Sequence, residues 1–133
     1  MANLYKKLGE MDFDGLISDI TPKTEVRAKK IRKLGTAETL KRGTILAMSS
    51  GTAGDGKLVI LGTTAATNET LTPDCILTDD IEVGTANDVV TTVYTAGCFD
   101  SGKITVKSGY TMTAADYDAL RKYGIVFKAA SAN

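Results

Sequence analysis

The stretch that decides the fold runs from residue 44 to residue 61: Thr44-Ile-Leu-Ala-Met48, then Ser49-Ser-Gly-Thr-Ala-Gly-Asp-Gly-Lys57, then Leu58-Val-Ile-Leu61. The outer segments are apolar runs of strand length, and the Gly- and Ser-rich segment between them is typical of a turn, which predicts a hairpin. The middle segment also fits the GxxxxGK part of a phosphate-binding loop. However, Leu58 stands where that loop needs Ser or Thr, and a strand follows where it needs a helix. We therefore predict a hairpin loop and no nucleotide site.

Further strands are predicted over residues 75–83, 89–99, 104–106 and 125–127, and a single short helix over about 113–124. Thr113 is placed to cap this helix, Asp116 three residues later forms an acidic capping box with it, and Gly124 is placed for the left-handed turn that ends it. One short helix among several strands predicts an α+β, mainly β fold. The β-rich domain is expected to span residues 41–133.

The N-terminal part has much weaker patterning. Residues 1–20 show irregular apolar spacing, and we predict that residues 1–40 form an extended arm with little intrinsic structure. Residues 24–34, TEVRAKKIRKL, have no clear apolar face as a strand or as a helix, so both remain open, with a preference for strand.

Composition excludes several classes of function. The 133 residues include 16 Lys and Arg, 16 Asp and Glu, and no His or Trp, so imidazole cannot act as a base or a metal ligand. Cys75 and Cys98 belong to no CxxC motif, and we expect buried thiols, although a disulfide between them stays open. No Ser has a positioned base. We predict that the protein is not an enzyme and needs no cofactor or metal.

The sequence also argues against a membrane protein. It contains no run of 18 apolar residues, and the start, MANLYKKLGEMDFDG, lacks the apolar core of a secretory signal. We therefore expect synthesis in the cytoplasm.

The order of several short segments is more informative than any one motif. Lys41–Ala47 and Lys57–Leu61 are followed by Pro73–Ile81, Tyr94–Phe99 and Leu120–Ile125. This succession resembles the lambda-type head decoration proteins of tailed bacteriophages, whose pattern is an "rGtvL" strand, an "IL-x-x-D" strand, an "hGxF" strand and a closing "LRxxGI". The resemblance covers residues 41–128.

The resemblance implies a homotrimer on the outer capsid surface of the virion, at three-fold and quasi-three-fold positions of the expanded head. Such proteins cement neighbouring copies of the major capsid protein against the pressure of packaged DNA. In this family the segment before the first conserved strand often becomes ordered on the capsid by adding a strand to a capsid-protein sheet.

The corresponding segment in this chain is unusually basic. Residues 1–46 hold ten Lys and Arg against six Asp and Glu, a balance of +4, which fits either a solvated charged face or an arm that meets an acidic partner. The predicted capsid-binding residues are Thr24, Val26, Arg27, Lys29, Lys30, Ile31, Arg32 and Lys33. Removal of residues 1–38 is then expected to leave a folded trimer that no longer attaches.

Two alternatives remain. One is another phage structural module, such as a tail or head-fibre component. The other is a small nucleic-acid-binding β-domain that uses the basic cluster, against which stand an isoelectric point of about 6.2 and the lack of aromatic side chains interleaved with basic ones.

Overall fold

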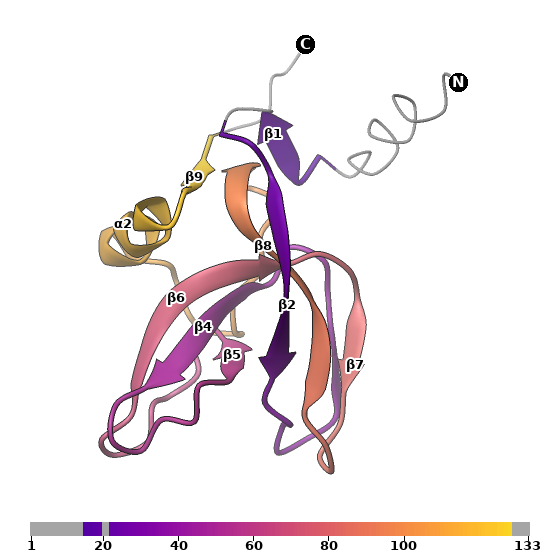
Figure 1. The fold of residues 1–133 in the computed structure, drawn as a ribbon, viewed down its shortest axis with the longest axis vertical. Coiled ribbons are helices and arrows are strands. Elements are labelled where there is room, and N and C mark those ends of the chain that lie inside the picture. The colour runs from indigo at the N-terminus through magenta and orange to yellow at the C-terminus, as the bar shows by residue number, and fades with distance from the viewer. Residues whose placement is uncertain (1–14, 20–21, 129–133) are drawn as a thin grey trace.

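The computed structural model describes residues 15–19 and 22–128. Its elements follow in the order β1 (Ile17–Asp19), β2 (Glu25–Ile31), β3 (Glu38–Leu40), β4 (Ile45–Ser50), β5 (Leu58–Ile60), β6 (Thr70–Leu77), β7 (Ile81–Val83), β8 (Val89–Phe99), α2 (Ala114–Lys122) and β9 (Ile125–Phe127). Figure 1 shows the strands wrapped around one another, with α2 packed at one side. The predicted mainly β fold with one short helix is confirmed.

The main sheet closes on itself as a small barrel. β8 is antiparallel to both β2 and β6, β6 is antiparallel to β4, β4 to β5, and β5 runs parallel to β2, which completes the circuit. Beyond the barrel, the end of β8 from Gly97 to Phe99 pairs with β1 on one edge and β9 on the other. β3 and β7 form a separate antiparallel pair.

The apolar runs that define the hairpin are buried on both faces. Ile45 and Ala47 belong to one buried cluster, together with Leu120 and Ile125 from α2 and β9. Leu46, between them, points into a second cluster that reaches β3 and β7. Since successive strand residues point to opposite faces, burial of both faces requires an unbroken apolar run. This explains why these strands lack polar alternation.

The helix follows its sequence signals closely. Thr113 caps it and accepts a hydrogen bond from the backbone of Asp116, whose carboxylate accepts one from the backbone of Thr113. Asp116 also accepts a hydrogen bond from the Tyr110 hydroxyl, and Gly124 takes a positive φ of 95° just after the helix. The capping box and the glycine exit are therefore confirmed.

The structure confirms two further predictions and contradicts one. The preference for strand over residues 24–34 is confirmed by β2, and both cysteines are buried free thiols. Residues 104–106 form only an isolated bridge, between Thr105 and Thr44, and not a strand. No helix within residues 15–19 and 22–128 is long and apolar enough to cross a membrane.

The prediction that residues 1–40 form an extended arm is wrong for residues 25–31 and 38–40. Glu25–Ile31 is a barrel strand paired along its length with β8, and Glu38–Leu40 pairs with β7. These residues pack into the body because Ile31 and Leu40 belong to the second buried cluster. Residues 1–14 of the predicted arm lie outside the described residues.

Candidate functional site

The predicted binding segment is the barrel strand with the most exposed side chains. Residues 25–28 and Lys30 are exposed, Lys29 is half-buried, and only Ile31 is fully buried. In Figure 1, β2 runs along the front of the barrel. Because most side chains of β2 are exposed, residues 24–34 have no apolar face, and their sequence pattern is therefore ambiguous between strand and helix.

One edge of β2 is paired along the whole strand and the other at one end only. Val26 to Ile31 stand opposite Tyr94 to Val89 of β8, whereas Ile31 alone is paired with β5, at Leu58. The Arg32 amide donates to the Leu58 carbonyl, at 2.9 Å. Because backbone groups alternate between the edges of a strand, Val26, Ala28 and Lys30 direct their amides and carbonyls to this second edge. Within the described residues, β5 reaches only the end of this edge, where the Ile31–Leu58 pairing directs the Leu58 amide to the Lys30 carbonyl. No strand pairs with Val26 or Ala28 there.

The structure divides the predicted binding residues into two groups. The side chains of Val26, Arg27, Lys30 and Lys33 are exposed, and Val26 keeps 52% of its accessible surface. Ile31 is completely buried and Arg32 is held in an ion-pair network, so both have structural roles and are withdrawn as binding residues. Thr24 is half-buried with its hydroxyl near Gly97, and Lys29 is engaged by Asp74.

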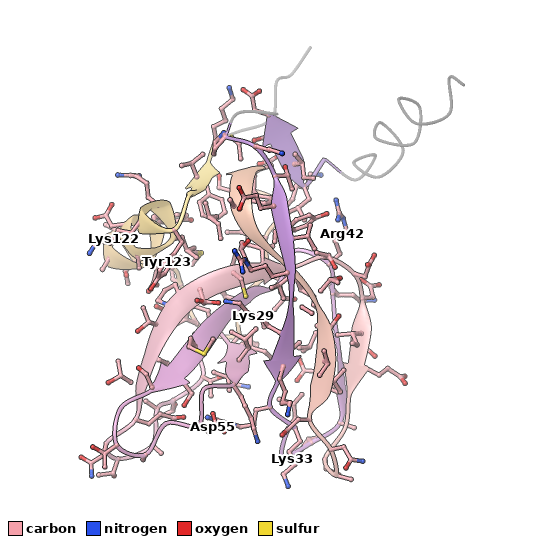
Figure 2. The ribbon with its side chains drawn as sticks, viewed as in Figure 1. Lys29, Lys33, Arg42, Asp55, Lys122 and Tyr123 are labelled. Atoms are coloured by element: carbon pink, nitrogen blue, oxygen red, sulfur yellow. The ribbon has the colours of Figure 1, made fainter. Side chains whose placement is uncertain are left out.

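A groove of about 330 Å³ lies beside the second edge of β2, lined by Glu25, Arg27, Lys29, Asp74, Thr95 and Tyr123. The Lys29 ammonium bonds Asp74 of β6 at 2.7 Å across it, and Tyr123, 55% exposed, stands at the end of α2 (Figure 2). The Thr95 hydroxyl is buried and has no hydrogen-bond partner. Sequence reasoning missed Asp74, Thr95 and Tyr123, because only tertiary pairing brings them to β2.

Arg32 fixes the lower end of β2 to two loops. Its guanidinium makes two 2.9 Å hydrogen bonds to Asp55, in the hairpin loop, and one of 2.6 Å to Glu69. The hydrogen bonds from Arg32 hold the pKa of Asp55 at about 2. Hydrogen bonds from the Ala66 amide, the Ser49 hydroxyl and Arg32 hold the pKa of Glu69 at about 2 as well. This network ties the residue that follows β2 to the loops that carry Asp55 and Glu69.

We expect the network to make the fold acid-sensitive. The folded pKa values of Asp55 and Glu69 lie below their ordinary values of 3.8 and 4.5. Their contribution is therefore complete above about pH 5 and is lost as the pH falls toward about 2. The urea midpoint of Arg32→Gln should be lower at neutral pH and should change less between pH 5 and pH 3 than that of the wild type. Lys41→Gln, which removes an exposed pair with Asp80, is the matched control. Equal acid dependence in Arg32→Gln and wild type would contradict this role.

The loop from Gly51 to Lys57 leads into a strand, where a phosphate-binding loop would lead into a helix. It joins the antiparallel strands β4 and β5, as predicted, and no helix follows it. Lys57 forms a 2.6 Å ion pair with Asp88, so its ammonium is already engaged.

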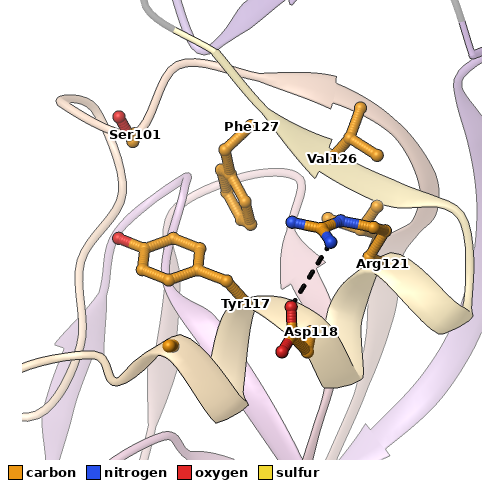
Figure 3. A pocket seen from close by; sticks show the side chains of 8 residues that line it. Ser101, Tyr117, Asp118, Arg121, Val126 and Phe127 are labelled. Atoms are coloured by element: carbon orange, nitrogen blue, oxygen red, sulfur yellow. Dashed lines mark ion pairs between the residues drawn. The ribbon is translucent and has the colours of Figure 1, made fainter.

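A second pocket, of about 410 Å³, lies between α2 and β9 (Figure 3). Tyr117 and Phe127 meet edge-to-face at 5.2 Å between ring centres, and Arg121 pairs with Asp118 at 3.4 Å. Ser101 also lines the pocket, and the carboxylate in the lining, Asp118, is the partner of Arg121.

No family model matches this sequence, and a search of curated proteins finds no match.

Proposed function

We propose that this protein is a capsid decoration protein of a tailed bacteriophage, which binds as a homotrimer to the outer surface of the expanded head and cements its subunits. The proposal begins from the ordered segments that resemble the lambda-type decoration family. Those segments contribute β4, β5, β6, β8 and the passage from α2 to β9, which together form most of the core. The observation that supports it most is the exposed basic strand β2, whose second edge is unpaired from Glu25 to Lys29 in the described residues.

This edge suits a protein that attaches to a shell made by others. Strand addition uses main-chain hydrogen bonds, so it makes few demands on the partner's side chains. Each such bond contributes only about 0.5–1.5 kcal/mol net, and ordering a segment costs about 1–2 kcal/mol per residue. A single site would bind weakly, but three sites on one trimer would raise the avidity by about 10²–10⁴.

The start of the chain also has a role in attachment to the capsid. The resemblance implies that the segment before the first family strand donates a strand to the major capsid protein. Since β2 belongs to the barrel, this donating role falls to residues that precede β1. Attachment would then use a donated segment and the basic surface of β2 together.

The test is binding to heads assembled without this protein. We expect saturable attachment to expanded heads, weak or no attachment to unexpanded proheads, a trimer by sedimentation, and greater resistance of decorated heads to heat. Lys30→Glu should weaken attachment and reduce its salt dependence, because it removes a cation that no ion pair engages among the described residues.

Failure of the wild-type protein to bind expanded heads would refute the proposal. Electron microscopy of labelled protein on virions separates the head from other locations: label confined to the tail or to head fibres would instead identify another structural module of the phage.

A further inference from the structure

We propose that the second edge of β2, from Val26 to Lys30, with the groove beside it, receives an extended acidic segment of the capsid protein as an additional strand. The identity of the partner as the capsid protein rests on the proposed function. The new claim is that a strand passes from the capsid protein to this protein. The barrel accepts a strand at this edge, independently of any segment that it donates.

The backbone geometry supplies the hydrogen-bonding groups. Two hydrogen bonds show which backbone groups of β2 point away from β8. The Arg32 amide bonds to Leu58 of β5, and the Thr92 carbonyl of β8 accepts from the hydroxyl of Thr78, the residue that follows β6. Both place the odd-numbered residues of β2 toward β8. They leave the amides and carbonyls of Val26 and Ala28, and the amide of Lys30, unpaired on the second edge. Such a row of unpaired groups is a template for another strand.

The exposed charges around this edge are mostly positive, with Glu25 the exception, and favour an acidic occupant. Lys23, Arg27 and Lys30 are exposed, and none of them makes an ion pair within residues 15–19 and 22–128. Lys29 is also close, although Asp74 neutralises it. Pairing of β2 with β2 of a second copy would bring these cations together, and like charges opposite each other are destabilising. An acidic segment relieves this repulsion, whereas a second copy increases it.

The two faces of β2 specify the pattern of the occupant. Arg27 and Lys29 face the groove, while Val26 and Ala28 lie on the outer face of the strand. An added strand places its own side chains alternately on the same two faces. Glu or Asp at alternate positions would meet the groove, and small apolar side chains between them would pack on Val26 and Ala28. The unpartnered Thr95 hydroxyl in the groove offers a further polar contact to the acidic side chains.

A backbone-blocking variant tests the proposal directly. Ala28→Pro removes an outward amide that makes no bond within the barrel, and proline is tolerated at such edge positions. Ala28→Thr is the matched control, because it keeps the amide and favours a strand. The probe is a short blocked peptide of alternating glutamate and valine, titrated into the full-length protein and followed by the backbone amide shifts of β2. A peptide with lysine for glutamate is the charge control.

We expect saturable shifts of the Val26, Ala28 and Lys30 amides in wild type and Ala28→Thr, and their loss in Ala28→Pro. The lysine peptide should bind at least about tenfold more weakly. The double variant Arg27→Glu with Lys30→Glu should reverse this preference, and it tests the site without proline if Ala28→Pro does not fold. The trimer should persist in all variants.

Each other outcome counts against a distinct claim. Absence of shifts in β2, or equal binding by Ala28→Pro, overturns the docking site even if the wild type decorates heads. Loss of the trimer in a folded Ala28→Pro also overturns it, because the edge would then join copies of this chain. Conversely, a wild-type protein that binds the glutamate peptide but not expanded heads refutes the decoration function and leaves the docking site standing.

Discussion

Deleting residues 1–38 is expected to prevent folding, instead of leaving the folded trimer that the sequence suggested. The deletion removes β1 and β2, and with them Leu16 and Ile31, which are 1% and 0% exposed. It also strips β8 of every partner along one edge, from Val89 to Phe99, so the barrel cannot close. Circular dichroism and urea titration should show no cooperative unfolding transition in the shortened chain.

Deleting residues 1–14 is the matched comparison. It retains every described residue and every strand pairing of the barrel, so the protein should still unfold cooperatively. If a segment before β1 donates a strand, this variant should remain trimeric and attach to expanded heads more weakly. A chain that lacks residues 1–38 and still unfolds cooperatively would show that β2 is dispensable to the barrel. Unimpaired attachment after removal of residues 1–14 would exclude strand donation by that segment.

The features that the sequence predicted correctly are those with local causes. The cap of α2 depends on Thr113 and Asp116, three residues apart, and its exit depends on Gly124. The hairpin from β4 to β5 likewise joins neighbouring apolar runs through a Gly-rich loop. In each case the interacting groups lie close in the chain, so propensity and spacing are sufficient to identify them.

β2 is assigned to the arm on sequence alone because the contacts that stabilise this strand are made with residues far away in the sequence. Only one of its seven residues, Ile31, is fully buried, so its composition resembles that of an unpacked arm. What holds it is the main-chain pairing with β8, some sixty residues later in the sequence, as in Ala28 opposite Thr92. Main-chain pairing leaves no trace in side-chain periodicity when both faces of a strand are largely exposed.

The candidate site was predictable only as a basic segment. Counting charges located Arg27 and Lys30, but it grouped them with Arg32, whose guanidinium is committed to Asp55 and Glu69. The distinction depends on which way a strand residue points and on loops that return from elsewhere. The edge itself, which centres on Ala28, carries no side-chain signal at all.

Ile31→Ala is expected to destabilise the protein by about 2–5 kcal/mol, the range for truncating a large buried aliphatic side chain. Ile31 is the single residue of β2 that pairs with both β8 and β5, opposite Val89 and Leu58. A cavity there weakens the seam at which the barrel closes. The free energy of unfolding from urea titrations, with Ile31→Val expected at about 0.5–1.5 kcal/mol, measures the effect.

Neighbouring exposed positions should behave in the opposite way, and the contrast assigns the two roles of β2. Arg27→Ala and Lys30→Ala change exposed side chains without ion pairs among the described residues, so their effect on unfolding should stay within about 0.5 kcal/mol. Both should nevertheless weaken attachment to expanded heads, because they remove charge from the docking edge. Ile31→Ala should attach normally at temperatures where it remains folded, since its side chain is fully buried and faces no partner. If Ile31→Ala lost attachment while still folded, or if Arg27→Ala unfolded as readily as Ile31→Ala, the division of β2 into a structural end and a docking edge would be wrong.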